Sequence, residues 1–192
     1  LMGEKISIIT HKAQTTRHRI LGILNEEDYQ IVFSDTPGII KPAYKLQESM
    51  MNFVYSAFQD ADVLIYLVEI GERALKDEAF FEKIKNTKIP LLLLVNKIDL
   101  SQQEEVEKQI NHWKEQVPNA EILPISALNK FNMDKILERI RELLPVAPPY
   151  YEKDAITDKS ERFFVSKLYT ASQSLRFASN LYICTARPPW GQ

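Results

Sequence analysis

Short apolar runs and stretches with helical spacing alternate along most of this chain. The runs are rich in branched side chains, as strands are, and cover residues 5–10, 31–33, 63–68, 89–95 and 122–125. Between the later runs, apolar residues recur every three or four positions, which predicts amphipathic helices. Strands that alternate with helices predict an α/β fold with a mostly parallel sheet. The apolar stripes of the expected helices are Leu46, Met50, Phe53, Val54, Ala57 and Phe58; Leu75, Ala79, Phe80 and Ile84; Val106, Ile110, Trp113 and Val117; and Ile136, Leu137, Ile140, Leu143 and Leu144, with Asn132 as N-cap of the last.

The first part of the chain departs from this alternation. Two strand-like segments, 18–24 and 29–33, flank the polar residues 25–28. A polar turn between two such segments is typical of a β-hairpin. We therefore expect one antiparallel pair of strands at one edge of the sheet.

Composition and charge exclude several classes of protein. Of the 192 residues, 45% are hydrophobic and 26% are charged, which excludes a wholly disordered chain, a collagen and a coiled coil. The formal net charge of −2 gives no overall basic field, so RNA binding would need a local patch. The single Cys184 excludes a disulfide framework within the chain, and no apolar run approaches the ~20 residues of a spanning helix. We expect a cytoplasmic protein.

The first of three short motifs is Asp35-Thr36-Pro37-Gly38, which follows the apolar run 31–33. Asp, Pro and Gly all favour turns, so a simple turn is one interpretation. The functional interpretation is a sensor for a terminal phosphate. Asp35 would hold Mg²⁺ through water, and Gly38 would offer its backbone N–H where a side chain would block the approach.

The second motif, Asn96-Lys97-Ile98-Asp99, directly follows a run of leucines and a valine. A polar exit from a strand is one interpretation, and guanine recognition is the other. The two carboxylate oxygens of Asp99 can accept hydrogen bonds from the adjacent N1–H and NH₂ of guanine, a donor pair that adenine lacks. The stem of Lys97 can lie over the base plane, while Asn96 can brace the loop and bond the base.

The third motif, Ser126-Ala127-Leu128, follows the apolar run 122–125 and is uninformative alone. In this position its backbone N–H would point at the guanine carbonyl. Asn96 follows Asp35 by 61 residues and precedes Ser126 by 30, which leaves room for the intervening helices and strands. All three motifs follow predicted strands, and open α/β sheets bind ligands at the carboxyl ends of their strands. Together they predict a GTP-binding domain.

These motifs resemble the translation-factor-like GTPases, and further residues narrow the resemblance to the Era family of ribosome-assembly GTPases. The narrowing segments are residues 5–10, 12–20, Tyr29-Gln30 and 156–163. The resemblance implies a G domain of the P-loop NTPase type, with GTP or GDP and Mg²⁺ as ligands. It implies that Gln14, Thr15, Thr16, Arg17 and His18 form the first switch loop, with Thr16 and Asp35 as Mg²⁺ ligands. The implied nucleotide-binding residues are Asp35, Thr36, Pro37, Gly38, Ile39, Asn96, Lys97, Ile98, Asp99, Ser126, Ala127 and Leu128.

Two departures from the family pattern shape the expected domains. The family's phosphate loop, Gly-x-x-x-x-Gly-Lys-Ser, is absent, because only Gly3 and Gly22 precede Asp35. The resemblance places a strand before that loop, between the strands that end at Asp35 and near Val68. We therefore expect a gap in the sheet and a nearly inactive chain. The family's RNA-binding KH domain needs a Gly-x-x-Gly loop, and after Gly71 the only glycine is Gly191.

The expected organisation is therefore a partial G domain over residues 1–144, a linker and entry to a second domain over 145–165, and a tail over 166–192 without a KH domain. Pro145, Pro148 and Pro149 end the last helix and start a stiff linker. After residue 165 no sustained period predicts a further element.

The resemblance implies a GTP-hydrolysing switch in assembly of the small ribosomal subunit, with GTP, that subunit and its 16S rRNA as partners of the intact parent. DNA is not an expected partner, and contact with the inner face of the cell membrane is an additional expectation. Hydrolysis proceeds by attack of water on the γ-phosphate. Some GTPases orient this water with a Gln where this chain has Ile39, so we name no catalytic residue. The alternatives are a non-catalytic α/β interaction module and the G domain of a related tandem-domain or tRNA-modifying GTPase.

Overall fold

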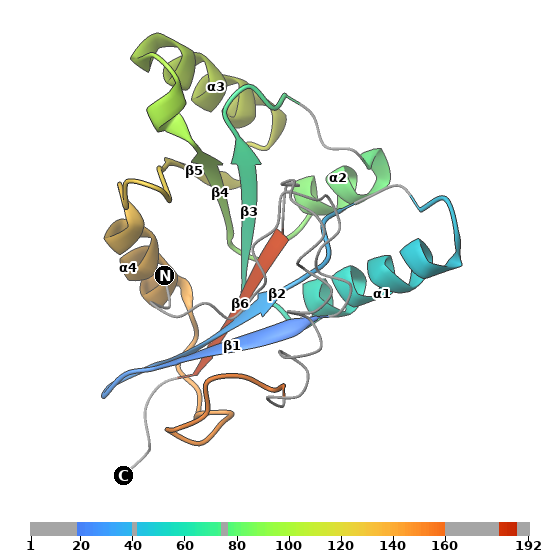
Figure 1. The fold of residues 1–192 in the computed structure, drawn as a ribbon, viewed down its shortest axis with the longest axis vertical. Coiled ribbons are helices and arrows are strands. Elements are labelled where there is room, and N and C mark those ends of the chain that lie inside the picture. The colour runs from blue at the N-terminus through green and yellow to red at the C-terminus, as the bar shows by residue number, and fades with distance from the viewer. Residues whose placement is uncertain (1–18, 40–41, 74–76, 160–180, 188–192) are drawn as a thin grey trace, which may run out of the picture.

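The computed structural model describes residues 19–39, 42–73, 77–159 and 181–187 (Figure 1). The predicted strand 5–10, the switch-loop residues 14–18, Leu75 and the family-like residues 160–163 therefore lie outside the described part. The elements are β1 (Ile20–Asn25), β2 (Gln30–Asp35), α1 (Lys45–Gln59), β3 (Val63–Glu69), α2 (Glu78–Lys85), β4 (Leu91–Asn96), the 3₁₀ helix η1 (Ile98–Leu100), α3 (Gln103–Gln116), β5 (Ala120–Pro124), α4 (Met133–Leu143) and β6 (Leu181–Arg187).

The predicted hairpin and the predicted parallel strands are both present. β1 pairs with β2 antiparallel, and the turn between them is closed by the Glu26 N–H, which donates to the Tyr29 carbonyl. β3 pairs with β4, and β4 with β5, both in parallel. The apolar runs 63–68 and 89–95 therefore contribute β3 and β4 inside the sheet, as the pattern predicted, whereas the run 122–125 contributes to β5 at its edge.

The centre of the sheet contains a strand that the sequence pattern did not predict. The strand order is β1-β2-β6-β3-β4-β5, and β6 runs antiparallel to both of its neighbours. The expected gap between β2 and β3 is therefore wrong. The facing edges of β2 and β3 carry backbone groups that need partners, and the segment Leu-Tyr-Ile-Cys-Thr-Ala-Arg has the branched and aromatic composition that favours strands.

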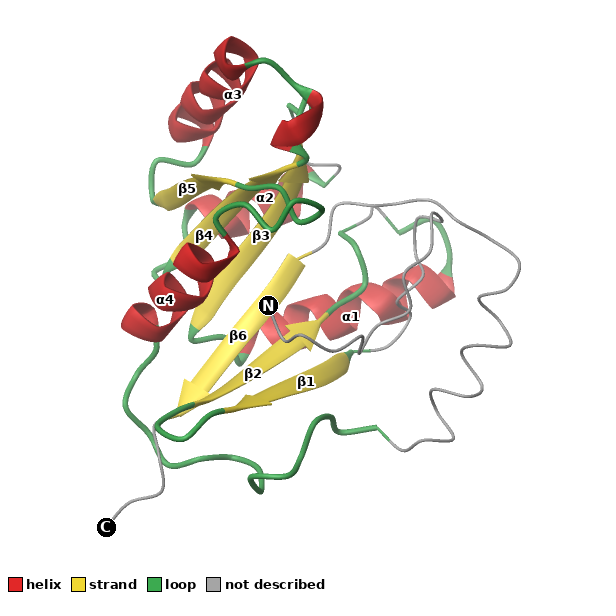
Figure 2. Cartoon of the chain, turned by 60° about the vertical axis from the view of Figure 1, so that its left-hand side comes forward, coloured by secondary structure: helices red, strands yellow, loops and turns green. Residues whose placement is uncertain are grey.

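Helices cover both faces of the sheet, and the strand side chains alternate between two apolar clusters. On one face, Leu64 and Tyr66 of β3 pack with residues of α1, α2 and α3, including the fully buried Trp113. On the other face, Val63 and Ile65 pack with residues of β2 and α4. Figure 2 shows α4 on one side of the sheet and α1 and α2 on the other. Within the described ranges, no helix has the length and apolar character needed to cross a membrane.

The first turns of α2 and α4 are held differently. Asp77 caps α2, because its Oδ1 accepts a hydrogen bond from the Phe80 N–H at 3.0 Å. Asn132 is the N-cap residue of α4, as predicted, but its backbone is left-handed and its side chain makes no capping hydrogen bond. Its side-chain amide instead donates to the Pro124 carbonyl at 2.9 Å, which ties the start of α4 to the end of β5.

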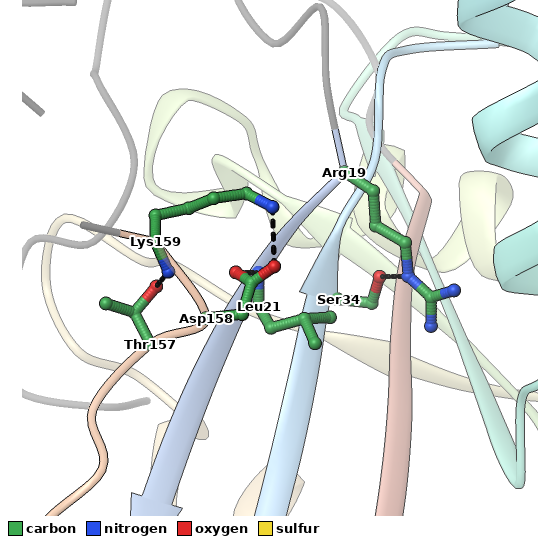
Figure 3. Close-up of polar contacts among 6 residues, drawn as sticks. All are labelled: Arg19, Leu21, Ser34, Thr157, Asp158 and Lys159. Atoms are coloured by element: carbon green, nitrogen blue, oxygen red, sulfur yellow. Dashed lines mark hydrogen bonds and ion pairs between the residues drawn. The ribbon is translucent and has the colours of Figure 1, made fainter. Parts of the chain in front are cut away.

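The segment that follows α4 runs along the outer edge of β1. The Ile23 N–H donates to the Ile156 carbonyl at 2.8 Å, and Gly22 forms an antiparallel bridge with Thr157. The Leu21 N–H donates to Asp158 Oδ1 at 3.0 Å, and Figure 3 shows Asp158 between Leu21 and the ammonium of Lys159. Part of an exposed strand edge, which would otherwise invite pairing with other chains, is thus covered.

One buried side chain fastens this segment to the hairpin. Gln30 is 4% exposed, and its Oε1 accepts hydrogen bonds from the N–H groups of Tyr150 and Tyr151 at 2.9 and 3.1 Å. Its amide nitrogen donates to the Tyr151 carbonyl at 2.9 Å and to Asn25 Oδ1 at 2.6 Å. The proline-rich linker is therefore seated on β1 and β2 by specific hydrogen bonds.

Candidate functional site

The three sequence motifs lie at one edge of the sheet. β3, β4 and β5 are parallel, and their register places Glu69 beside Asn96, and Val95 beside Pro124. β2 runs in the same direction as β3, because both are antiparallel to β6. Asp35 at the end of β2 pairs with Tyr182 of β6, and the adjacent Leu181 of β6 pairs with Tyr66 of β3. The strands that carry the motifs therefore point to the same side of the sheet, as the strand pattern predicted, although Asp35 is level with Ile65 and lies four residues short of Glu69 (Figure 1).

The segment after β4 turns sharply at Lys97. Lys97 has a φ of 65°, in the left-handed region, and η1 starts at the next residue. A non-glycine residue in this region is strained, and such residues concentrate at functional sites, where surrounding contacts hold them. Here the Ile98 N–H donates to the Ile125 carbonyl at 3.4 Å, which anchors the turn to the end of β5.

Two side-chain hydrogen bonds join the second and third motifs. Asn96 Oδ1 accepts from the Ala127 N–H at 3.0 Å, and Ser126 Oγ donates to Asp99 Oδ1 at 2.5 Å. Ser126 is 2% exposed, and its Oγ also accepts from the Asn129 N–H. Residues that are about thirty positions apart in the sequence therefore form one polar cluster.

The first two backbone N–H groups of the third motif have partners within the chain. The Ser126 N–H donates to the Phe131 carbonyl, and the Ala127 N–H is taken by Asn96. Neither can also point at a ligand carbonyl without losing its present partner. Leu128, which is 83% exposed, is the one motif residue whose N–H has no acceptor within the described part of the chain.

The carboxylate of Asp99 is held on one side and open on the other. It accepts from Ser126 through one oxygen, while Asp99 as a residue is exposed to solvent. A carboxylate offers about four acceptor positions, so one internal hydrogen bond leaves capacity for a ligand with two adjacent donors. The side chain is thus tied to the loop after β5 rather than turned away from it.

Lys97 is held by an acidic residue that the motif analysis did not identify. Its Nζ lies 2.7 Å from Glu69 Oε1, and both side chains are partly exposed. Glu69 ends β3, so the rule that placed the other motifs at strand ends also applies to it. The signal was present in the sequence, directly after the apolar run 63–68.

The Asp35 segment is more enclosed than the loops after β4 and β5. Asp35 is 8% exposed, and Thr36, Pro37, Gly38 and Ile39 are buried. Within the described ranges, no group of three or more His, Cys, Asp or Glu residues is placed to hold a metal ion. Mg²⁺ commonly binds through one or two carboxylates together with water and substrate phosphates, and the single Asp35 carboxylate at the ligand edge fits that pattern. The predicted second ligand, Thr16, lies outside the described residues.

Comparison with known proteins identifies the family of this chain. Residues 1–97 match the family described as 50S ribosome-binding GTPase. The chain is 43% identical over 169 residues to the GTPase Era of Clostridium perfringens, and 42% identical over 169 residues to that of Clostridium novyi. These matches cover 88% of this chain but only 57% and 58% of the two relatives. Since the family model spans half of the sequence, the chain belongs to the 50S ribosome-binding GTPase family, and the resemblance to the Era GTPases that its motifs predicted is confirmed.

Proposed function

We propose that this chain contains the guanine-binding half of a GTP-hydrolysing switch protein. The observation that carries the proposal is the paired cross-linking of two loops, with Ser126 bonded to Asp99 and Ala127 bonded to Asn96. These contacts fix a carboxylate and an amide on two neighbouring loops, and the stem of Lys97 lies between them in the sequence. That is the donor and acceptor set that the edge and face of guanine require.

Asp99 supplies the discrimination between bases. Its free acceptor positions can take both the N1–H and the exocyclic NH₂ of guanine, whereas adenine offers no such adjacent donors. Hydrogen bonds to a charged group contribute ~1.5–3 kcal/mol each, so each of the two contacts favours guanine by roughly 10- to 100-fold. Leu128 would offer its N–H to the guanine carbonyl.

The Asp35 loop would face the phosphates. Asp35 and Thr16 would hold Mg²⁺, and Gly38 would donate its N–H to the terminal phosphate, with Thr36, Pro37 and Ile39 completing the loop. Residues 14–18 would form the first switch loop. Bound Mg²⁺ would neutralise charge that develops on the phosphates during hydrolysis. Ile39 cannot hydrogen-bond a water, so it does not orient the nucleophile.

Nucleotide titration tests the guanine site directly. The sequence lacks a Gly-x-x-x-x-Gly-Lys-Ser loop, so we expect weak binding that is best followed by ligand-observed NMR with GDP, ADP and xanthosine diphosphate. Wild type should prefer GDP, and Asp99→Asn should reverse the preference towards xanthosine diphosphate, whose C2 carbonyl accepts from an amide NH₂. Equal binding of GDP and ADP would refute the guanine site and favour a non-catalytic interaction module.

The partners of the whole protein follow from the family rather than from the site. The matched family description names the 50S subunit, whereas resemblance to Era suggests the small subunit and its 16S rRNA. We propose the small subunit, in the cytoplasm or at the inner face of the membrane. Cosedimentation of the chain with purified 30S and 50S subunits tests this, and retention by 50S alone would contradict it.

A further inference from the structure

A buried glutamine of α3 braces the turn that follows β3. Gln109 is 7% exposed although its side chain is polar. Its Oε1 accepts from the Gly71 N–H at 3.0 Å, and its amide nitrogen donates to the Glu72 carbonyl at 2.5 Å and to the Glu69 carbonyl at 3.5 Å. Both ends of the amide are thus satisfied by the backbone of one turn, and a buried polar group so completely bonded fixes its partners.

The turn itself permits little movement. The Glu72 N–H donates to the Glu69 carbonyl, and the Glu69 N–H donates to Glu72 Oε2. Gly71 has a φ of 87°, a conformation that side-chain-bearing residues rarely adopt. The Ile70 N–H donates to the Asn96 carbonyl at 3.0 Å, so the turn is also tied to the first residue of the guanine motif.

The rigid turn presents Glu69 to the guanine loop. Glu69 Oε1 lies 2.7 Å from Lys97 Nζ, and Lys97 has the left-handed backbone described above. A free lysine side chain samples many rotamers, and restricting it before a ligand arrives reduces the entropy lost on binding. An ion pair between partly exposed groups contributes little to folding stability. We therefore expect the Glu69–Lys97 pair to matter through the position of the lysine side chain rather than through the stability of the fold.

We propose that Glu69 and Gln109 are positioning residues for nucleotide binding. Gln109 fixes the turn, the turn fixes Glu69, and Glu69 holds the Lys97 stem where it can cover the face of the base. The inference rests on the proposed guanine site. It adds that two residues outside the three sequence motifs, one on β3 and one on α3, position the lysine that covers the plane of the base.

The test is a double-mutant cycle read out by GDP and inosine diphosphate affinity. Glu69→Ala should weaken GDP binding about fivefold, the upper range for loss of an exposed ion pair. It should weaken inosine diphosphate by the same factor, because this base lacks only the exocyclic amine that Asp99 binds. In a Lys97→Ala background, Glu69→Ala should have no further effect, since it acts through Lys97.

Two further variants separate positioning from structural damage. Glu82→Ala removes an ion pair with Lys85 on α2, remote from the site, and should leave GDP affinity unchanged. Gln109→Met keeps the side-chain volume and removes every hydrogen bond to the turn, so its effect on GDP should match that of Glu69→Ala. Urea unfolding of each variant, followed by Trp113 fluorescence, gives the folded fraction by which affinities are corrected.

The outcomes distinguish this inference from the proposal beneath it. If Glu69→Ala weakens GDP equally in the presence and absence of the Lys97 side chain, Glu69 does not act through Lys97 and the inference fails. If Asp99→Asn switches the base preference while Glu69→Ala changes nothing, the guanine site stands and the inference fails. If wild type shows no saturation transfer to millimolar GDP, both fail together.

Discussion

Replacing Gln30 by alanine should release the segment after α4 from the sheet and lower stability. The substitution removes four hydrogen bonds, two accepted from Tyr150 and Tyr151 and two donated to Tyr151 and Asn25. Net contributions are about 0.5–1.5 kcal/mol per bond. Tyr150 is exposed, so water can replace part of what its N–H loses. We therefore expect a loss of about 2–3 kcal/mol, a large share of the ~5–15 kcal/mol that stabilises a typical domain.

Equilibrium unfolding in urea measures this loss. The fully buried Trp113 should report the transition by fluorescence. With a slope of about 1–3 kcal/mol/M, the midpoint should fall by roughly 1 M while the slope stays unchanged. Chymotrypsin, which cleaves after aromatic residues, should also cut faster at Tyr150 and Tyr151 under native conditions, because local release exposes that backbone.

A second glutamine provides the matched control. Gln103 lies at the start of α3 and makes one exposed hydrogen bond, to Glu107. Gln103→Ala should change stability by less than about 0.5 kcal/mol and leave cleavage unchanged. If Gln30→Ala unfolds at the same urea concentration as Gln103→Ala, Gln30 does not fasten the linker and the reasoning from its buried contacts is refuted.

Three further predictions concern the turn, the hairpin and the central strand. Gly71→Ala should lower the free energy of unfolding in urea by about 1 kcal/mol. Backbone strain alone would cause this loss, since a methyl group at this position meets no atom within 4 Å. An unchanged free energy of unfolding would contradict the turn geometry. Burial, and then the charge of Glu26, raise the pKa of Tyr29, so the fold favours the neutral phenol. The free energy of unfolding should therefore fall as pH rises above about 10. Between pH 9 and pH 11, Tyr29→Phe should lose less stability than the wild-type protein does. Ile183→Pro places a residue without an N–H between β2 and β3 and should destabilise the fold by about 3 kcal/mol. The control Ile183→Val should be near neutral, and thermal unfolding measures both variants. Similar values for the two would argue against β6.

Local patterns were sufficient for the elements whose partners are nearby in the chain. Residues 63–68, apart from the half-buried Leu67, and residues 91–95 are buried on both faces of the sheet, and this burial is the reason that their sequences lack polar alternation. The motifs after β4 and β5 follow their strands directly, so parallel topology alone placed them at one edge. That part of the site could be predicted because its geometry depends on strand direction rather than on side-chain detail.

The features that were missed depend on partners far away in sequence. β6 lies between strands that precede it by well over a hundred residues, and a seven-residue apolar segment carries no signal for where it pairs. Asn132 occupies the predicted N-cap position, but the contact of its side-chain amide with the Pro124 carbonyl was not predicted. Gln109 stands four residues before Trp113 on the buried face of α3, and its partners in the turn became visible only in three dimensions.

The direction of β6 determines what the sheet can offer to a phosphate. At the edge where β2, β3, β4 and β5 end, β6 begins, with Leu181 opposite Tyr66. A strand that ends at such an edge can continue into a glycine turn and present the amino end of a helix to an anion. β6 instead ends at the far edge, where Arg187 pairs with Gln30. β6 therefore begins at the side of the sheet where its neighbours end, and it finishes beside Gln30, the residue that holds Tyr150 and Tyr151.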